Sequence, residues 1–222
     1  SDRNQTYRNK IIDAITTNET SWFRDSSPYV CLEEYIIPDL INRFKNKEQN
    51  KIRIWSAAAS TGQEPYSIAM IIDGLVNKTT GISINDFEIL GTDISASALF
   101  LATAARYDQI SMQRGMRADF LEKYFTKLSN IWVLDDKIRK MVTLKKFNLQ
   151  DSFISFGIFD VILCRNVAIY FSTEFKKDLF ERISRSMRPN GYFLIGASEN
   201  LSGYTEKFVM KNYNRSVYYQ LK

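Results

Sequence analysis

Apolar residues recur at helical spacing near the start of the chain. Residues 7–16 place isoleucines on one side, and residues 28–47 repeat apolar side chains every three or four positions, so both segments are predicted to be helices. Pro38 lies inside the second segment and predicts a kink there, because proline removes a helical hydrogen bond. The polar and aromatic stretch TTNETSWFRD, which separates the two segments, shows no regular period.

From residue 51 onward, short apolar runs alternate with longer segments of helical period. Strands alternating with helices predict a parallel, doubly wound sheet, and the nearly continuous apolar run near Cys164 predicts a strand covered on both faces. Ser95 and Thr173 are the expected N-caps of two of the helices. The expected strands are residues 51–57, 87–94, 157–166 and 191–198, and the expected helices are residues 65–76, 96–105 and 173–187.

Two stretches depart from this alternation. After a short helix at residues 117–125, the pattern reads as two or three short strands with a turn near Asp135, so we expect a small antiparallel β-subdomain at about residues 126–147. The final residues predict a hairpin that turns at residues 212–215. A terminal hairpin that adds one antiparallel strand is the usual end of the class I methyltransferase fold. We therefore expect an N-terminal helical segment and linker over residues 1–50, followed by one domain of this fold over residues 51–222.

Composition narrows the class of protein further. The chain has 222 residues, of which 45% are hydrophobic and 25% charged, which suits one soluble α/β domain. It has no apolar run of about 18 residues, so we expect no membrane insertion. Its two cysteines lie in apolar contexts that favour buried, reduced thiols and a cytoplasmic location. The net charge of +5 comes from scattered basic residues, so we expect a monomer without a nucleic-acid partner.

The chain contains no histidine. This excludes Ser-His-Asp and Cys-His catalysis and HExxH zinc sites, and we expect no metal. The chemistry must need little proton transfer or must use Asp, Glu, Lys or Tyr. Methyl transfer from a sulfonium to a carboxylate meets that requirement.

A loop of small residues, from Ala57 to Gly62, joins the strand at residues 51–57 to the following helix. Small side chains let a backbone approach a ligand closely, and a helix N-terminus favours polar or anionic groups. The loop lacks the glycine pattern of dinucleotide sites and the lysine of a P-loop, which disfavours nucleoside triphosphates. Glu64 in the first helical turn is placed to meet a cationic amino group, or else only stabilises the helix dipole.

Other candidate ligand residues follow the predicted strands. Asp93 ends the strand at residues 87–94, where an acidic side chain typically binds ribose hydroxyls, although a turn or cap role is the alternative. Arg165, Asn166 and Tyr170 follow the strand at residues 157–166 and are expected in the same crevice, unless Tyr170 is a core aromatic. The absence of an Asn/Asp-Pro-Pro-Tyr/Phe motif there argues against amine acceptors.

Arg24 lies beside two aromatic residues in the irregular stretch near the N-terminus. Its planar guanidinium is suited to orienting an acceptor carboxylate. A surface ion pair with Asp25 would explain the same sequence.

Five stretches together resemble the CheR family of bacterial chemotaxis protein-glutamate O-methyltransferases. They are TNETSWFRD, SAAASTGQEPYSIAM, TDIS, CRNVAIYF and GYFLIGASENL, and they occur in order from Thr17 to the end of the chain. The resemblance implies a seven-stranded, mostly parallel sheet with one antiparallel strand. It also implies that S-adenosylmethionine is converted to S-adenosylhomocysteine as glutamates on the cytoplasmic domain of a chemoreceptor are methylated. The alternatives are a methyltransferase for another acceptor and a catalytically silent module that binds S-adenosylmethionine or S-adenosylhomocysteine.

The resemblance also assigns roles to individual residues. Arg24 and Tyr170 are expected to face the methyl group and the incoming carboxylate, as the catalytic pair. Glu64 would contact the methionyl part of the donor, Asp93 the ribose, and Asn148 with Leu149 the region around the adenine. The complete expected donor site is Asn18, Thr20, Arg24, Ala57, Glu64, Asp93, Asn148, Leu149, Arg165 and Asn166.

Overall fold

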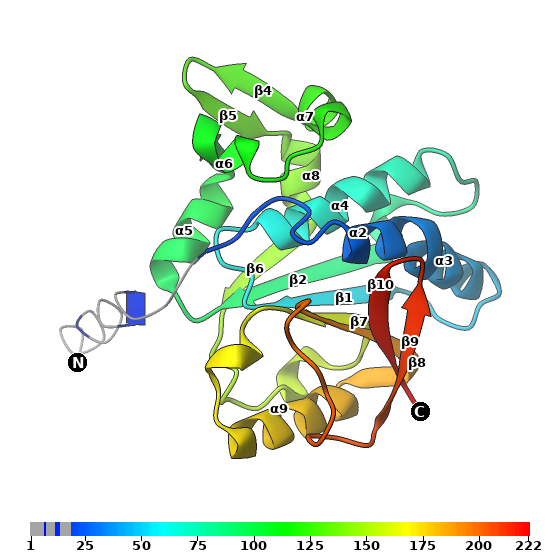
Figure 1. Cartoon of the computed structure of the whole chain (residues 1–222). Coiled ribbons are helices and arrows are strands. Elements are labelled where there is room, and N and C mark those ends of the chain that lie inside the picture. The colour runs from blue at the N-terminus through cyan, green and yellow to red at the C-terminus, as the bar shows by residue number, and fades with distance from the viewer. Residues whose placement is uncertain (1–6, 8–11, 14–18) are drawn as a thin grey trace.

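A computed structural model describes residues 7, 12, 13 and 19–222 of the chain (Figure 1). The expected helix at residues 7–16 and the candidate residue Asn18 lie largely or wholly outside the described residues. The centre of the molecule is a seven-stranded sheet with the order β6-β2-β1-β7-β8-β10-β9. The strands are β1 (Ile52–Ala57), β2 (Phe87–Asp93), β6 (Val142–Lys146), β7 (Phe159–Cys164), β8 (Met187–Ile195), β9 (Phe208–Tyr213) and β10 (Ser216–Leu221).

The pairing of these strands confirms the predicted fold class. Strands β6, β2, β1, β7 and β8 are parallel to one another. Strand β10 is antiparallel to both β8 and β9, so the terminal hairpin inserts one antiparallel strand into the sheet. The architecture is that of the class I methyltransferase fold.

Helices cover both faces of the sheet and bury two apolar clusters. Helix α4 (Gln63–Val76) packs on one side, whereas α9 (Thr173–Arg185) lies on the other, at the bottom of Figure 1. Along β1, Ile54 belongs to the first cluster and the next residue, Trp55, to the second. This alternation follows from the two-residue period of a strand, and it explains why the central strands carry apolar side chains on both faces.

The N-cap of α9 differs from the expected one by a residue. Ser172, not Thr173, has the extended backbone of an N-cap, and its hydroxyl oxygen accepts a hydrogen bond from the backbone N–H of Phe175 at 3.2 Å. Ser95 caps α5 (Ala96–Ala104) as predicted, since its hydroxyl oxygen accepts from the N–H of Ala98 at 3.0 Å.

The predicted kink at Pro38 takes the form of a π-helical turn. The chain runs from α2 (Ser27–Cys31) through this turn (Leu32–Ile36) into α3 (Ile37–Lys45). Proline has no N–H to donate to the carbonyl four residues earlier, and the wider turn lets Ile37 donate to Leu32 five residues back. The helical path therefore continues across the proline.

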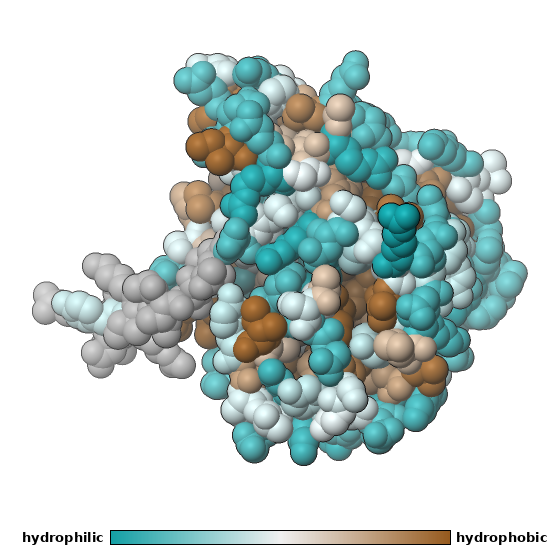
Figure 2. Space-filling view, in the orientation of Figure 1, coloured by the Kyte–Doolittle hydropathy of each residue, from teal (hydrophilic) through white to brown (hydrophobic). Residues whose placement is uncertain are grey.

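The small antiparallel sheet exists, but its bounds differ from residues 126–147. It contains β3 (Arg106–Asp108), β4 (Phe125–Leu128) and β5 (Ile131–Leu134), and it projects at the top of Figure 1. The segment after Asp135 forms a helix, α8 (Asp136–Lys140), instead of a strand, and β6 joins the main sheet. Helices α6 (Gln109–Gln113) and α7 (Ala118–Tyr124) complete this subdomain. Apolar atoms gather on its surface over β5 and α6 (Figure 2), and its exposed apolar side chains include Ile110, Leu128 and Ile131.

The crossover from β6 to β7 carries no α-helix. It contains only the 3-10 turn Ile154–Phe156, so part of one sheet face beside β2 and β6 stays open. Among the described residues, none of the helices is long and apolar enough to span a membrane.

Candidate active site

A cavity of about 430 Å³ lies at the carboxyl ends of β1, β2 and β7. This is the edge at which open α/β sheets bind ligands. The cavity brings together most of the residues that the sequence singled out. The predicted residues that line it are Thr20, Arg24, Glu64, Asp93, Asn148, Leu149, Arg165, Asn166 and Tyr170.

The loop between β1 and α4 reaches the cavity through a tight backbone path. Ala58, Ser60 and Gly62 have φ angles of +63°, +50° and +93°. A Cβ atom on Gly62 would lie 2.8 Å from the ring of Tyr66, so only glycine fits this helix start. Ala58 and Ser60 line the cavity, whereas the predicted Ala57 is fully buried in the sheet core and does not.

Asp93 holds this loop in place from the end of β2. One oxygen of its carboxylate accepts from the N–H of Ser60 at 2.7 Å, and the other accepts from the N–H of Ser95 at 2.9 Å. Burial raises the pKa of the Asp93 carboxyl more than these backbone N–H groups lower it. The carboxylate still has acceptor capacity for a ligand hydroxyl.

Arg165 lies at the centre of a buried ionic network. Its Nη1 is 3.0 Å from Glu64 Oε2, its Nη2 is 2.7 Å from Asp25 Oδ2, and the same Nη2 donates to the carbonyl oxygen of Arg24 at 2.7 Å. The remaining oxygen of Glu64 accepts from the Ser56 hydroxyl at 2.9 Å. The side chain of Arg165 is only 1% exposed, so this network joins β1, α4 and the N-terminal segment at one point.

The charges of this network do not cancel. Two carboxylates share one guanidinium, and Asp93 adds a third carboxylate at the same cavity. Burial lowers the pKa of Arg165, but Tyr29 and the two carboxylates raise it more, so the net shift is upward and the guanidinium stays charged. Burial raises the pKa of the Tyr29 hydroxyl, which therefore stays neutral. We call the part of the cavity lined by Glu64, Asp93 and Arg165 the donor side, and its net negative charge favours a cation.

Arg24 and Tyr170 form the more exposed part of the lining, which we call the acceptor side. Arg24 is half-buried and donates to the carbonyl oxygen of Glu19 at 3.1 Å. Its alternative partner, Asp25, pairs with Arg165 instead. Tyr170 is 62% exposed, so the alternative that it is a core aromatic is wrong.

The segment that carries Arg24 is anchored to the small subdomain by Trp22. The indole is fully buried and packs edge-on against Tyr107 and Phe125, with ring centroids 4.8 and 5.3 Å away. The backbone N–H of Trp22 donates to the carbonyl oxygen of Arg114 at 3.0 Å. Gly115 has a φ of +87°, and a Cβ atom there would collide with the carbonyl oxygen of Trp22.

Asn148, Leu149 and Asn166 complete the predicted set. Leu149 is buried, and the amide oxygen of Asn148 accepts from the N–H of Gln150 at 3.0 Å, which fixes the loop after β6. The amide oxygen of Asn166 is buried and has no hydrogen-bond partner among the described residues. A buried acceptor of this kind requires a donor, and a ligand in the cavity can supply one.

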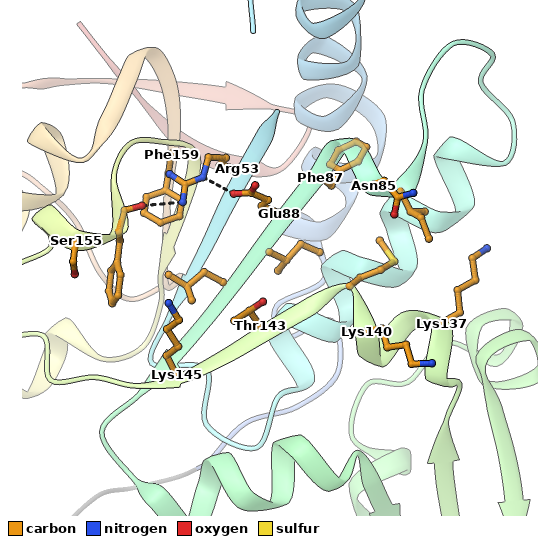
Figure 3. A pocket seen from close by; sticks show the side chains of 15 residues that line it. Arg53, Asn85, Phe87, Glu88, Lys137, Lys140, Thr143, Lys145, Ser155 and Phe159 are labelled. Atoms are coloured by element: carbon orange, nitrogen blue, oxygen red, sulfur yellow. Dashed lines mark hydrogen bonds and ion pairs between the residues drawn. The ribbon is translucent and has the colours of Figure 1, made fainter. Parts of the chain in front are cut away.

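A second cavity, of about 560 Å³, lies on the open sheet face beside β2 and β6 (Figure 3). Its lining includes Phe87–Leu90, Arg53 and Phe159, which belong to the amino-terminal parts of β2, β1 and β7. These positions lie away from the carboxyl ends of the strands. The smaller cavity is therefore the candidate active site.

Comparison with known proteins agrees with this geometry. The family model described as CheR methyltransferase, SAM binding domain, matches residues 18–217. The chain belongs to the CheR methyltransferase family. It is therefore a methyltransferase that uses S-adenosylmethionine, as the resemblance implied.

Individual relatives match over almost the whole chain. The chemotaxis protein methyltransferase Cher2 of Pseudomonas putida is 40% identical over 97% of this chain and 78% of its own length. Chemotaxis protein methyltransferase 1 of Pseudomonas aeruginosa is 41% identical over the same shares. The chemotaxis protein methyltransferase of Vibrio parahaemolyticus is 40% identical over 99% of this chain and 78% of its own.

Several lining residues were not predicted from the sequence. Ser60 and Phe147 are neighbours of predicted positions in the same loops, so the loops themselves were the available signal. Tyr29 belongs to α2, and nothing in its local sequence indicates that its hydroxyl meets Arg165 at 3.4 Å. Residues brought in from distant segments have no local signature.

Proposed function

We propose that this protein transfers the methyl group of S-adenosylmethionine to glutamate carboxylates on the cytoplasmic part of a chemoreceptor, forming glutamate methyl esters. The observation that carries the proposal is one cavity with a negatively charged donor side and an acceptor side formed by Arg24 and Tyr170. The relatives named chemotaxis protein methyltransferases support a chemoreceptor as the partner.

The donor side suits the charges of S-adenosylmethionine, which carries a sulfonium and an ammonium group. Glu64 uses only part of its acceptor capacity on Arg165 and Ser56, so it can still accept from the ammonium group. Asp93 would bind the ribose hydroxyls. Asn148 and Leu149 would lie along the adenine, and Asn166 would accept from the donor with its unpaired amide oxygen.

The reaction requires positioning more than proton transfer. When bound, the donor supplies a sulfonium methyl group: a carboxylate oxygen bonds to its carbon as the carbon–sulfur bond breaks and the bonding electrons neutralise the sulfur. A glutamate carboxyl has a pKa of about 4.3 in water and is already ionised at neutral pH, so no general base is needed. Arg24 holds the carboxylate and Tyr170 aligns it with the methyl carbon.

The acceptor class is tested by the stability of the product. Receptor cytoplasmic fragments are incubated with the protein and with donor carrying a radiolabelled methyl group, and the labelled fragments are then treated with mild alkali. We expect the label to be released as methanol, because carboxyl methyl esters hydrolyse in alkali. Alkali-stable label would mean a nitrogen or carbon acceptor, and donor binding without any label would mean a silent module.

The role of Tyr170 is tested by Tyr170→Phe, which removes only the hydroxyl. We expect turnover to fall by about tenfold or more, with donor affinity nearly unchanged, because the hydroxyl acts on the aligned acceptor. Tyr213→Phe on the edge strand β9 is the matched control and should retain full turnover. Full activity of Tyr170→Phe would contradict the assignment.

A further inference from the structure

The loop that follows β7 is held by a carboxylate outside the cavity lining. Glu199, in the loop after β8, accepts with Oε2 from the backbone N–H of Asn166 at 2.8 Å and from that of Gly196 at 2.6 Å. Its Oε1 accepts from the N–H groups of Val167 and Ile169, at 3.1 and 3.3 Å. One carboxylate therefore satisfies four backbone N–H groups.

These hydrogen bonds hold a loop whose regular structure is a single 3-10 turn, Ala168–Tyr170. Strand β7 ends at Cys164, and Asn166 has a left-handed φ of +58°, a conformation that asparagine adopts more readily than most residues with a side chain. Hydrogen bonds to an ionised acceptor are roughly twice as strong as neutral ones. The carboxylate of Glu199 thus stabilises this loop conformation.

Gly196 allows this arrangement by permitting close approach. A Cβ atom at that position would lie 2.7 Å from the side-chain nitrogen Nδ2 of Asn166 and 2.8 Å from Oε2 of Glu199. A side chain at this position would have to displace the side chains of Asn166 and Glu199. The segment GASEN therefore holds the loop that leads to Tyr170.

We propose that Glu199 is a positioning residue for methyl transfer. Its carboxylate fixes the backbone from Asn166 to Ile169 and so sets the place of the next residue, Tyr170, at the acceptor side. Glu199 is not among the residues that line the cavity and acts through the loop alone. The inference rests on the proposed role of Tyr170 in the reaction.

The first test measures the hydrogen bonds themselves. In Glu199→Gln, an amide N–H₂ replaces one acceptor oxygen and faces N–H groups, so we expect the backbone amides of Asn166, Val167 and Ile169 to exchange with deuterium about ten- to hundredfold faster. Glu206→Gln is the matched control, since Glu206 is exposed and lies seven positions along the same loop. Unchanged exchange in Glu199→Gln would overturn the proposal.

The second test measures turnover with receptor fragments and S-adenosylmethionine. We expect Glu199→Gln to lower kcat about ten- to hundredfold, with a smaller rise in the donor KM, because small misplacements of an aligning group are costly. Combined with Tyr170→Phe, it should lower kcat little beyond the larger single effect, since both changes remove the same alignment. Effects that multiply, or a kcat equal to that of Glu206→Gln, would overturn the proposal.

Two further measurements keep the result interpretable. Glu199→Asp keeps the charge but retracts it by one methylene, so it should restore part of kcat if Glu199→Gln folds poorly; no difference between the two would refute the need for the charge. Wild-type protein must first give alkali-labile label. A failure of the proposed function is therefore seen in the wild type, before any variant is compared.

Discussion

Replacing Arg165 by methionine should destabilise the protein strongly. Methionine is similar in length but apolar, so Glu64 would lose the guanidinium with which it pairs, within a site where the Glu64 side chain is 12% exposed. Removing one partner of a buried ion pair typically costs about 3–5 kcal/mol, because the other charge stays buried. Asp25 is 31% exposed, so its lost pair adds less than about 1 kcal/mol.

The assay is urea unfolding followed by circular dichroism. With a slope of about 2.5 kcal/mol per molar urea for a chain of this size, a loss of about 4 kcal/mol lowers the midpoint by about 1.5 M. Arg185→Met is the control, since the Arg185 side chain is 73% exposed in its pair with Glu181. We expect that control to change the unfolding free energy by about 0.5 kcal/mol or less.

A second variant separates the buried charge from lost packing. Adding Glu64→Gln to Arg165→Met removes the unpaired carboxylate, while the amide can still bond to the Ser56 hydroxyl. The double variant should regain part of the lost stability. An unfolding free energy of Arg165→Met within about 1 kcal/mol of the wild type would show that the unpaired carboxylate does not destabilise the fold. The same conclusion would follow if the double variant were no more stable than Arg165→Met.

Three further changes test other parts of the fold. Burial raises the pKa of the Asp73 carboxyl, but two lysines and a tyrosine lower it more, so its ionised form stabilises the fold above its ordinary pKa of 3.8. Asp73→Asn should therefore lower stability at pH 7 by about 1–3 kcal/mol in urea unfolding, and this deficit should shrink as the pH falls below the ordinary pKa of 3.8 and through the lowered pKa of the folded state. Gly115→Ala should lower the melting temperature far more than Gly203→Ala, because both have positive φ but only the first meets a backbone carbonyl; equal effects would exclude the collision. Ser172→Ala should cost about 1 kcal/mol and Thr173→Ala much less, and the reverse order would restore Thr173 as the cap.

The sheet and most of the candidate site followed from local pattern. Asp93 and Arg165 come directly after apolar strands, so their place at one edge follows from the parallel topology alone. The small-residue loop before Glu64 could be placed for the same reason. Helix and strand periods are properties of neighbouring residues, which is why the sequence reveals them.

Features that depend on distant contacts could not be read in this way. The pairing of Arg165 with Asp25 joins residues 140 positions apart, and the four N–H groups on Glu199 come from two loops. The small subdomain also includes β3, which pairs with β5 although α6, α7 and β4 separate the two along the chain, so no local pattern assigns β3 to it. The parallel register of β6 with β2 shows that β6 belongs to the main sheet.

The anchoring of Trp22 has a thermodynamic consequence. Its ring is enclosed by Tyr107 and Phe125 of the small subdomain, while Arg24 lies only two residues further along the chain. A molecule that binds the subdomain and shifts these rings must therefore change the free energy of placing Arg24. Linkage is reciprocal: a carboxylate held by Arg24 changes the affinity of the subdomain for that molecule by the same factor. The fluorescence of Trp22 can report this coupling from either end.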